Sequence, residues 1–137
     1  MIAAVRRFFL WLLLLGGVGV VLGVLWQAFS IAAYVRGAGE GALDAHLTGS
    51  FFVHVTQLAI VIGAVGAFWG RWLAVLGALG FLVLCVAQLA FLGDTDEQGG
   101  WINGLHGLLA LVILLCGVGY AARARRELGV GTPAVGR

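Results

Sequence analysis

The stretch Trp101-Ile102-Asn103-Gly104-Leu105-His106-Gly107-Leu108 opens the last of four long apolar runs and places an imidazole just inside it. An ionisable side chain within a membrane-spanning helix is energetically costly, so it marks a functional position by default. The polar positions around it are repeated, because Gln88 lies 18 positions before His106 and Gln27 lies 19 before His46. The sequence therefore predicts two related Gln and His pairs.

The composition defines the class of protein. Of the 137 residues, 62% are hydrophobic and 10% are charged, and the mean hydropathy is +1.08. Soluble domains average about 45–50% apolar and about 25% charged residues. The chain is thus expected to be an integral membrane protein in contact with the lipid bilayer. Nucleic-acid binding is not expected, because the arginines flank apolar runs and form no basic patch.

The apolar runs are long enough to cross a membrane as helices. At 1.5 Å rise per residue, about 20 residues span a hydrocarbon core of about 30 Å. We place the spans at about 8–31, 46–68, 73–92 and 101–122, within a domain of residues 1–128 followed by a flexible tail, 129–137. The alternative, a cleaved signal peptide at the start, is disfavoured because the first run exceeds the usual apolar region of about 7–15 residues. The predicted fold is an all-α, four-helix transmembrane bundle.

Small residues predict where these helices pack closely. Gly19 and Gly23 are four positions apart in the first span, a spacing that offers a flat face to another helix. Ala59, Gly63 and Ala67 repeat this spacing in the second span. The second span is also the most polar, so we expect it to face the bundle interior; its polar residues are His46, Thr48, Ser50, His54, Thr56 and Gln57.

The arginines predict the orientation. In a four-span arrangement seven of the eight fall on one side, with Arg36 alone on the other. The positive-inside rule then places both termini and the turn at Arg71 in the cytoplasm, with the chain in a bacterial inner membrane. The connections near residues 34–45 and 93–100, the second of them acidic, face outward. His46 and His106 therefore begin spans at one depth, and the two helix pairs form a parallel pseudo-twofold repeat.

Two histidines at one depth on different helices suggest a cofactor. Neutral imidazole is the commonest protein ligand for metals and a standard axial ligand of haem iron. We expect His46 and His106 to ligate the iron of one haem b, with Gln27 and Gln88 in the same site. Neighbouring glycines would let the flat macrocycle approach the backbone; these are Gly49, Gly104 and Gly107. The alternative is that each histidine only hydrogen-bonds a neighbouring helix.

Other polar residues have several interpretations. His54 lies about 12 Å deeper than His46 by helix rise. We expect it to hydrogen-bond Gln57 or Ser50 on its own face, with a haem propionate, or a second metal or haem site shared with Cys85, as alternatives. Asp44 and Asn103 would cap spans two and four or fix the tautomer of the adjacent imidazole, and Cys116 is read as a packing residue.

The polar pattern resembles a known family. A Gln late in the first helix, a His opening the second, a Gln in the third and a His early in the fourth resemble one four-helix half of haem A synthase, and also small uncharacterised four-helix membrane proteins of bacteria. The resemblance covers roughly residues 26–122 and implies that His46 and His106 are the axial pair of a b-type haem. The chain departs from the family: it has one half only, no Arg follows His46, no cysteine pair lies in the outer loop, and Asp44 stands where the family has a nearby Glu. Haem A synthesis is therefore not implied.

Two functions follow as alternatives. The first is a cytochrome b-like electron-transfer protein that exchanges electrons with a quinone, a periplasmic carrier or a partner complex, alone or with a haem site completed across a homodimer. The second is a cofactor-free structural or accessory subunit. A proton-coupled multidrug exporter is excluded because no Asp or Glu lies within a predicted span. No serine sits in a strand-to-helix elbow and no phosphate-binding glycine loop occurs, so the sequence identifies no catalytic residue and leaves open whether the chain is an enzyme.

Overall fold

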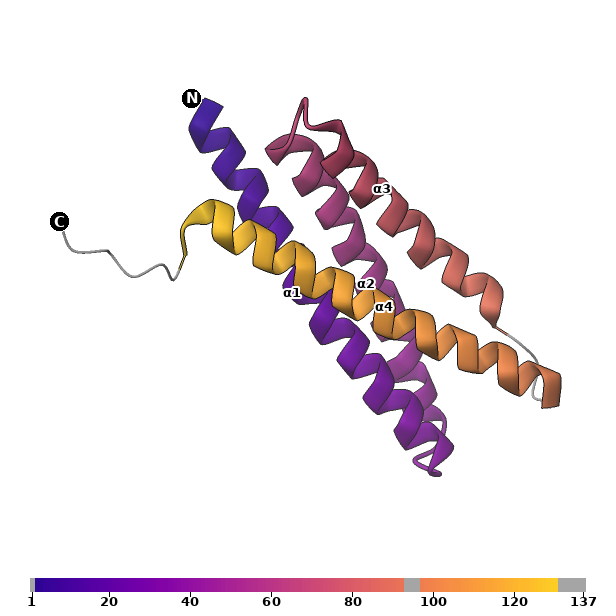
Figure 1. The fold of residues 1–137 in the computed structure, drawn as a ribbon. Helices are drawn as coiled ribbons and strands as arrows, with labels where there is room; N and C mark the ends of the chain where they lie inside the picture. Colours follow the sequence, from indigo (N-terminus) through magenta and orange to yellow (C-terminus); the bar gives the residue numbers. More distant parts are fainter. Residues whose placement is uncertain (1, 93–96, 131–137) are drawn as a thin grey trace.

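A computed structural model of the chain describes residues 2–92 and 97–130 and is all-α in these parts (Figure 1). Its elements are α1 (Ile2–Val35), α2 (Glu40–Ala67), α3 (Trp72–Ala87), the short 3-10 helix η1 (Gln88–Phe91) and α4 (Glu97–Leu128). Four helical segments, with η1 continuing α3, are long and apolar enough to cross a membrane. The predicted four-helix fold is confirmed, and the chain is a multi-pass membrane protein.

The helices extend beyond the apolar runs. α1 begins at Ile2 and ends at Val35, and α4 continues through the arginines to Leu128. Backbone hydrogen bonding continues outside the apolar core of a bilayer, whereas the predicted spans were bounded by hydropathy alone. Of the acidic connection, Asp94 and Asp96 lie outside the described residues, as do residues 131–137 of the predicted tail.

The connection between α1 and α2 corrects one prediction. α2 begins at Glu40, and its N-cap is Gly39, which adopts φ 83° and makes no side-chain cap hydrogen bond. Glycine populates this left-handed region at no steric cost, so the chain turns there. Asp44 consequently lies inside α2 and is not its N-cap. Asn103 likewise lies inside α4, which starts at Glu97.

Glycines set the close contacts of α1. A Cβ on Gly19 would meet the Thr56 side chain of α2, and one on Gly63 of α2 would lie 2.8 Å from the backbone nitrogen of Leu13. On another side of α1, a Cβ on Gly17 would lie 2.8 Å from the backbone oxygen of Gly117 in α4. The predicted close packing through Gly19 and Gly63 is confirmed, and α1 uses its small residues against both neighbours.

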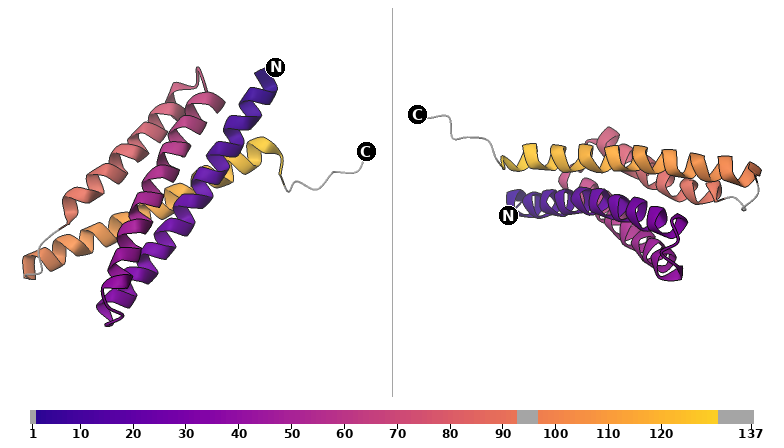
Figure 2. Two further views of the ribbon diagram at one scale, coloured as in Figure 1. Left: turned by 180° about the vertical axis from the view of Figure 1, so that it is seen from behind. Right: turned by 90° about the horizontal axis from the view of Figure 1, so that it is seen from below.

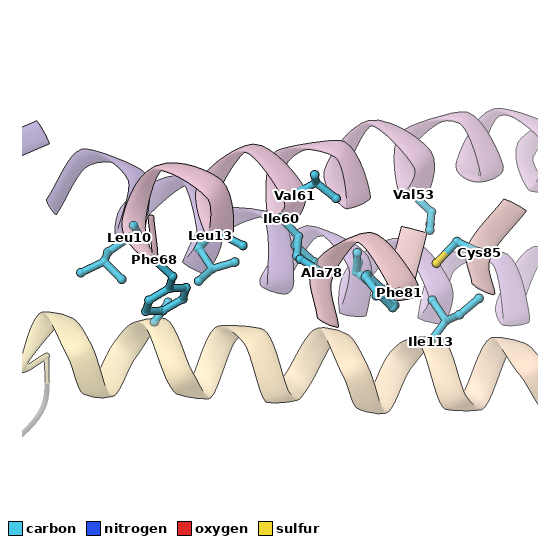
Figure 3. Close-up of a cluster of buried hydrophobic side chains, with 14 of the residues drawn as sticks. Leu10, Leu13, Val53, Ile60, Val61, Phe68, Ala78, Phe81, Cys85 and Ile113 are labelled. Atoms are coloured by element: carbon cyan, nitrogen blue, oxygen red, sulfur yellow. The ribbon is translucent and has the colours of Figure 1, made fainter. Parts of the chain in front are cut away.

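The two helix pairs pack differently. α1 and α2 contact each other along much of their length, and α4 crosses α1, whereas α3 packs on α2 and approaches α4 mainly through η1 (Figures 1 and 2). The core lies between these elements, with Val53, Cys85 and Ile113 close together toward one end of the view and Leu10 and Phe68 toward the other (Figure 3). Much of the apolar surface of α3 and α4 stays exposed, as suits contact with lipid.

The arginines predicted to share a side do gather at one end. Arg6 of α1 contacts Glu127 of α4 at 2.6 Å and donates to the Ala67 carbonyl of α2. Arg71, in the turn before α3, lies 3.5 Å from the other Glu127 oxygen. We call this the arginine end and the opposite end, where α2 and α4 begin, the histidine end. Arg137 lies outside the described residues.

Candidate functional site

The first Gln and His pair joins the histidine ends of α1 and α2. The ring Nδ1 of His46 is 3.0 Å from the backbone oxygen of Gln27. In return, the Gln27 side-chain amide donates to the backbone oxygen of His46 at 3.4 Å. Each residue therefore offers its side chain to the backbone of the other, an arrangement that we call a Gln–His bracket.

The second pair forms the same bracket between η1 and α4. His106 Nδ1 is 3.1 Å from the backbone oxygen of Gln88, and the Gln88 amide donates to the backbone oxygen of His106 at 2.9 Å. The same four atoms take part in both brackets. The spacing seen in the sequence thus has a structural counterpart, because each Gln contacts the His that follows it.

The repeat extends from the brackets into the core. Gln88 lies 61 positions after Gln27, and His106 lies 60 positions after His46. Some of the buried residues recur at these same two offsets on the corresponding helices, whereas others, such as Gly16 and Gly19, correspond to exposed positions. The matched buried positions are Gly17 and Ala78, Val20 and Phe81, Val24 and Cys85, Val53 and Ile113, Gln57 and Gly117, and Ala64 and Ala124. The two helix pairs therefore share part of a buried face as well as the Gln and His positions.

The brackets fix the protonation pattern of both imidazoles. A backbone carbonyl can only accept a hydrogen bond, so each Nδ1 must carry the proton and donate it. In the neutral ring the other nitrogen, Nε2, then bears the lone pair. His46 and His106 are thus held as the tautomer that presents Nε2 to a Lewis acid.

The ring of His54 also uses Nδ1 to contact a backbone oxygen, here one helical turn earlier on its own helix. Its Nδ1 is 2.8 Å from the backbone oxygen of Ser50, one of the two partners that the sequence predicted, although the contact is to the backbone. Its Nε2 is buried and has no hydrogen-bond partner within residues 2–92 and 97–130. The same is true of Oε1 of Gln57, a side chain only 1% exposed. A buried acceptor without a partner is costly, so this face of α2 is suited to a donor or a cation.

The space around the two brackets differs. A Cβ added to Gly104 or Gly107, beside His106, would meet nothing within 4 Å. A Cβ on Gly49 would lie 2.8 Å from the Trp26 ring. The prediction that Gly49 leaves room for a macrocycle is therefore wrong, because the indole of Trp26 fills that space. The open side of the site is at His106.

Two contributors to the first bracket were missed by the sequence reasoning. The Trp26 indole donates to the Ala45 backbone oxygen at 3.1 Å, next to the bracket. The hydroxyl of Ser30, which is 2% exposed, donates to the same Gln27 oxygen that accepts from His46. The signal was available for Ser30, since it follows Gln27 by three positions and a serine can bond back over one helical turn.

Within residues 2–92 and 97–130, His46 and His106 have different hydrogen-bond partners. They belong to different brackets, α2 and α4 scarcely touch, and the turn after α1 lies apart from the start of α4 in all three views (Figures 1 and 2). In the described part of the chain no three His, Cys, Asp or Glu side chains gather as a metal cluster. Cys85 packs in the apolar core. A group bound by both histidines would have to lie between the two helix pairs.

Removing the Gln side chain from one bracket should weaken the fold measurably. We expect Gln27→Leu and Gln88→Leu each to lower the free energy of unfolding by about 0.5–1.5 kcal/mol, the usual net value of a hydrogen bond. The Gln backbone oxygen remains, so His46 and His106 keep their Nδ1 acceptors. Unfolding in a denaturing detergent, followed by circular dichroism, measures the change. Thr48→Val, at an exposed position of α2, is the control, and an equal loss in this variant would contradict the role of the brackets.

Comparisons with protein-family models, with curated proteins and with solved structures find no match to this chain. The likeness to one half of haem A synthase accordingly stays a prediction that rests on Gln27, His46, Gln88 and His106. What the structure adds is that these four residues form two equivalent brackets.

Proposed function

We propose that the chain is a membrane protein that binds one b-type haem through His46 and His106 and serves in electron transfer. The observation that carries the proposal is the contact of each Nδ1 with a backbone carbonyl oxygen. Each Nδ1 donates to a backbone carbonyl, and metal-ligating histidines almost always donate their other ring N–H in this way. Such a bond orients the ring and makes Nε2 a stronger ligand.

The surroundings of His106 fit a flat, apolar group. A Cβ added to Gly104 or Gly107 would meet nothing within 4 Å, so a flat ring system can approach the α4 backbone there. Leu105 and Leu108 are exposed apolar side chains on the same helix, and they would cover the macrocycle from water. These features support a haem edge on this face.

Within this proposal the chain's own residues have distinct tasks. Gln27 and Gln88 accept from the imidazoles and tie the ligand-bearing turns to the neighbouring helices. A haem bound at this end would supply one-electron chemistry, with its potential set by burial and by hydrogen bonding around the ligands. His54 and Gln57 present buried acceptors deeper along α2, where they would accept a hydrogen bond from a polar donor group. A quinone or a redox partner protein would complete the electron path.

Binding by both histidines would also join the two helix pairs. Because His46 and His106 lie on helices that scarcely touch, the haem would act as the link between them at the histidine end. A ligand that binds only the folded state stabilises it by mass action. Haem-loaded protein should therefore unfold at a higher temperature than haem-free protein.

One observation favours a second function, that of a cofactor-free structural subunit. Both brackets are complete without any ligand, since each Gln amide and each Nδ1 already has a backbone partner. Polar contacts of this kind fix the register of membrane helices. In that case the brackets would act as clamps at the ends of the helix pairs, and Nε2 would have no ligand to bind.

The absorption spectrum of the purified protein distinguishes the two functions. The full chain, expressed with added haem and purified in detergent, should show a sharp Soret band and, after reduction with dithionite, resolved α and β bands. These bands report low-spin, six-coordinate haem, as two imidazole ligands produce. A featureless spectrum after haem supplementation would refute the cytochrome function and leave the structural one.

A further inference from the structure

The arginine end contains a second arrangement that the haem proposal does not use. Phe68, the last residue packed at the end of α2, is 1% exposed and presents its ring to two guanidinium groups. Arg123 of α4 lies 4.1 Å from the ring centroid, and Arg71 lies 5.2 Å from it. One buried ring therefore contacts two cations, one from α4 and one from the turn before α3.

The charges at this end are not balanced. Six described arginines gather there, and the only described acid among them is Glu127. Glu127 already contacts Arg6 at 2.6 Å and reaches Arg71 only at 3.5 Å. The guanidinium carbon of Arg123 lies over the face of the Phe68 ring. A guanidinium carries its N–H donors in a planar fork whose geometry matches the oxygens of a phosphate.

A cavity lies between these two arginines. It measures about 410 Å³ and is lined by Arg71, Trp72, Leu73, Ala74 and Arg123. Three of the lining residues form the first turn of α3, a helix of 16 residues whose start has no side-chain cap. The positive end of the helix dipole adds to the two guanidinium charges at this point. The walls of the cavity are thus suited to an anion.

We propose that this cavity binds the phosphate headgroup of an anionic phospholipid, held between Arg71 and Arg123. Three exposed side chains beside the cavity indicate a lipid as the source of the phosphate. Trp69 and Trp72 are 72% and 57% exposed, and tryptophan is enriched at the headgroup level of membranes. Leu73 lines the cavity and is 89% exposed, so acyl chains can pack against it while the headgroup meets the arginines.

This inference is independent of the haem, which would lie at the opposite end of the helices. It also accords with the expected orientation, because an arginine end in the cytoplasm would face the leaflet that carries anionic lipids. The lipid would bridge the start of α3 and the last turns of α4, which contact each other little along their length. It would thereby stabilise the looser of the two helix pairs.

A lipid titration of the full chain tests the site. The detergent-purified protein is titrated with dioleoylphosphatidylglycerol, and the thermal unfolding midpoint gives an apparent Kd. We expect Arg123→Gln to weaken binding by about tenfold, as for the loss of a charge-assisted hydrogen bond. Arg7→Gln removes an exposed arginine of the same end, outside the cavity, and is expected to leave the Kd nearly unchanged. Arg71→Gln provides a second variant should Arg123→Gln fail to fold.

Three results would overturn the proposal. Equal losses in Arg123→Gln and Arg7→Gln would show a general charge effect in place of a site. Equal stabilisation by dioleoylphosphatidylcholine would show that the anionic headgroup is not recognised. Saturation of the same shift by sodium phosphate alone would show a site for free anions and exclude the lipid. Stabilisation by phosphatidylglycerol that depends on Arg123 and Arg71 would support it.

Discussion

Replacing His46 or His106 by alanine is expected to abolish the low-spin haem spectrum. Each substitution removes one axial nitrogen, and a bis-histidine site cannot hold six-coordinate iron with one ligand missing. The α band of the reduced protein should disappear in either variant, and the amount of haem recovered per protein should fall severalfold. Reduced-minus-oxidised spectra and a pyridine haemochrome assay measure these changes.

The controls separate ligation from folding. Leu115→Ala changes an exposed apolar residue of α4 nine positions from His106 and should retain the spectrum. The helical content of His46→Ala and His106→Ala, measured by circular dichroism, should match that of the wild type. Loss of haem in His54→Ala with retention in His46→Ala would contradict the ligand assignment and move it to the buried Nε2 of His54.

Gly17→Leu should destabilise the fold more than the loss of either bracket. A Cβ at this position would lie 2.7 Å from the backbone nitrogen of Ala121 and 2.8 Å from the backbone oxygen of Gly117. Backbone atoms cannot rotate away, so α4 would have to separate from α1. Overpacking of this kind costs about 1–3 kcal/mol, and we expect the upper end of that range. Detergent-induced unfolding followed by tryptophan fluorescence measures it.

Gly80→Leu is the matched control for this prediction. Gly80 is also a helical glycine, in α3, and a Cβ there would meet nothing within 4 Å. We expect its unfolding free energy to change by less than about 0.5 kcal/mol, as for surface substitutions. If Gly17→Leu were as stable as Gly80→Leu, the close crossing of α1 and α4 would not exist in the protein.

Glycines at matching positions of the two helix pairs have different neighbours, so the two pairs pack differently. Gly16 and Gly19 of α1 correspond, 61 positions later, to Gly77 and Gly80 of α3. In α1 these glycines lie directly against α2. In α3, a Cβ on Gly77 would find only the Tyr120 hydroxyl, at 3.8 Å. The second helix pair, α3 and α4, is therefore joined at its Gln–His bracket but is not closely packed along its length.

Several features could be predicted from residues alone. The four apolar runs fixed the number of helices, because about 20 apolar residues are needed to cross a membrane. The spacing of Gln27 and His46, and of Gln88 and His106, identified two pairs that the structure then joined by hydrogen bonds. The distribution of the arginines predicted that Arg6, Arg71 and Arg123 share one end.

Other predictions failed because they assumed local geometry. Asp44 was expected to start α2, but the helix begins at Glu40, since Gly39 supplies the turn and the intervening residues continue the helix. Gly49 was expected to face a cofactor, but it faces Trp26. In both cases the residue type was compatible with the predicted role, but the earlier helix start decided against Asp44 and the Trp26 side chain of α1 decided against Gly49.

By itself the sequence determined that this chain forms four membrane-crossing helices, with a Gln and a His at matching positions of the two helix pairs and arginines at the opposite end. Hydropathy and charge act on each segment separately, so they can be read without knowing its neighbours. Only the tertiary structure decided that the imidazoles donate through Nδ1, that α1 packs on both α2 and α4, and that His46 and His106 lie in separate brackets. These features depend on which helix faces meet, and the faces of nearly uniform apolar helices carry no periodicity that would reveal it.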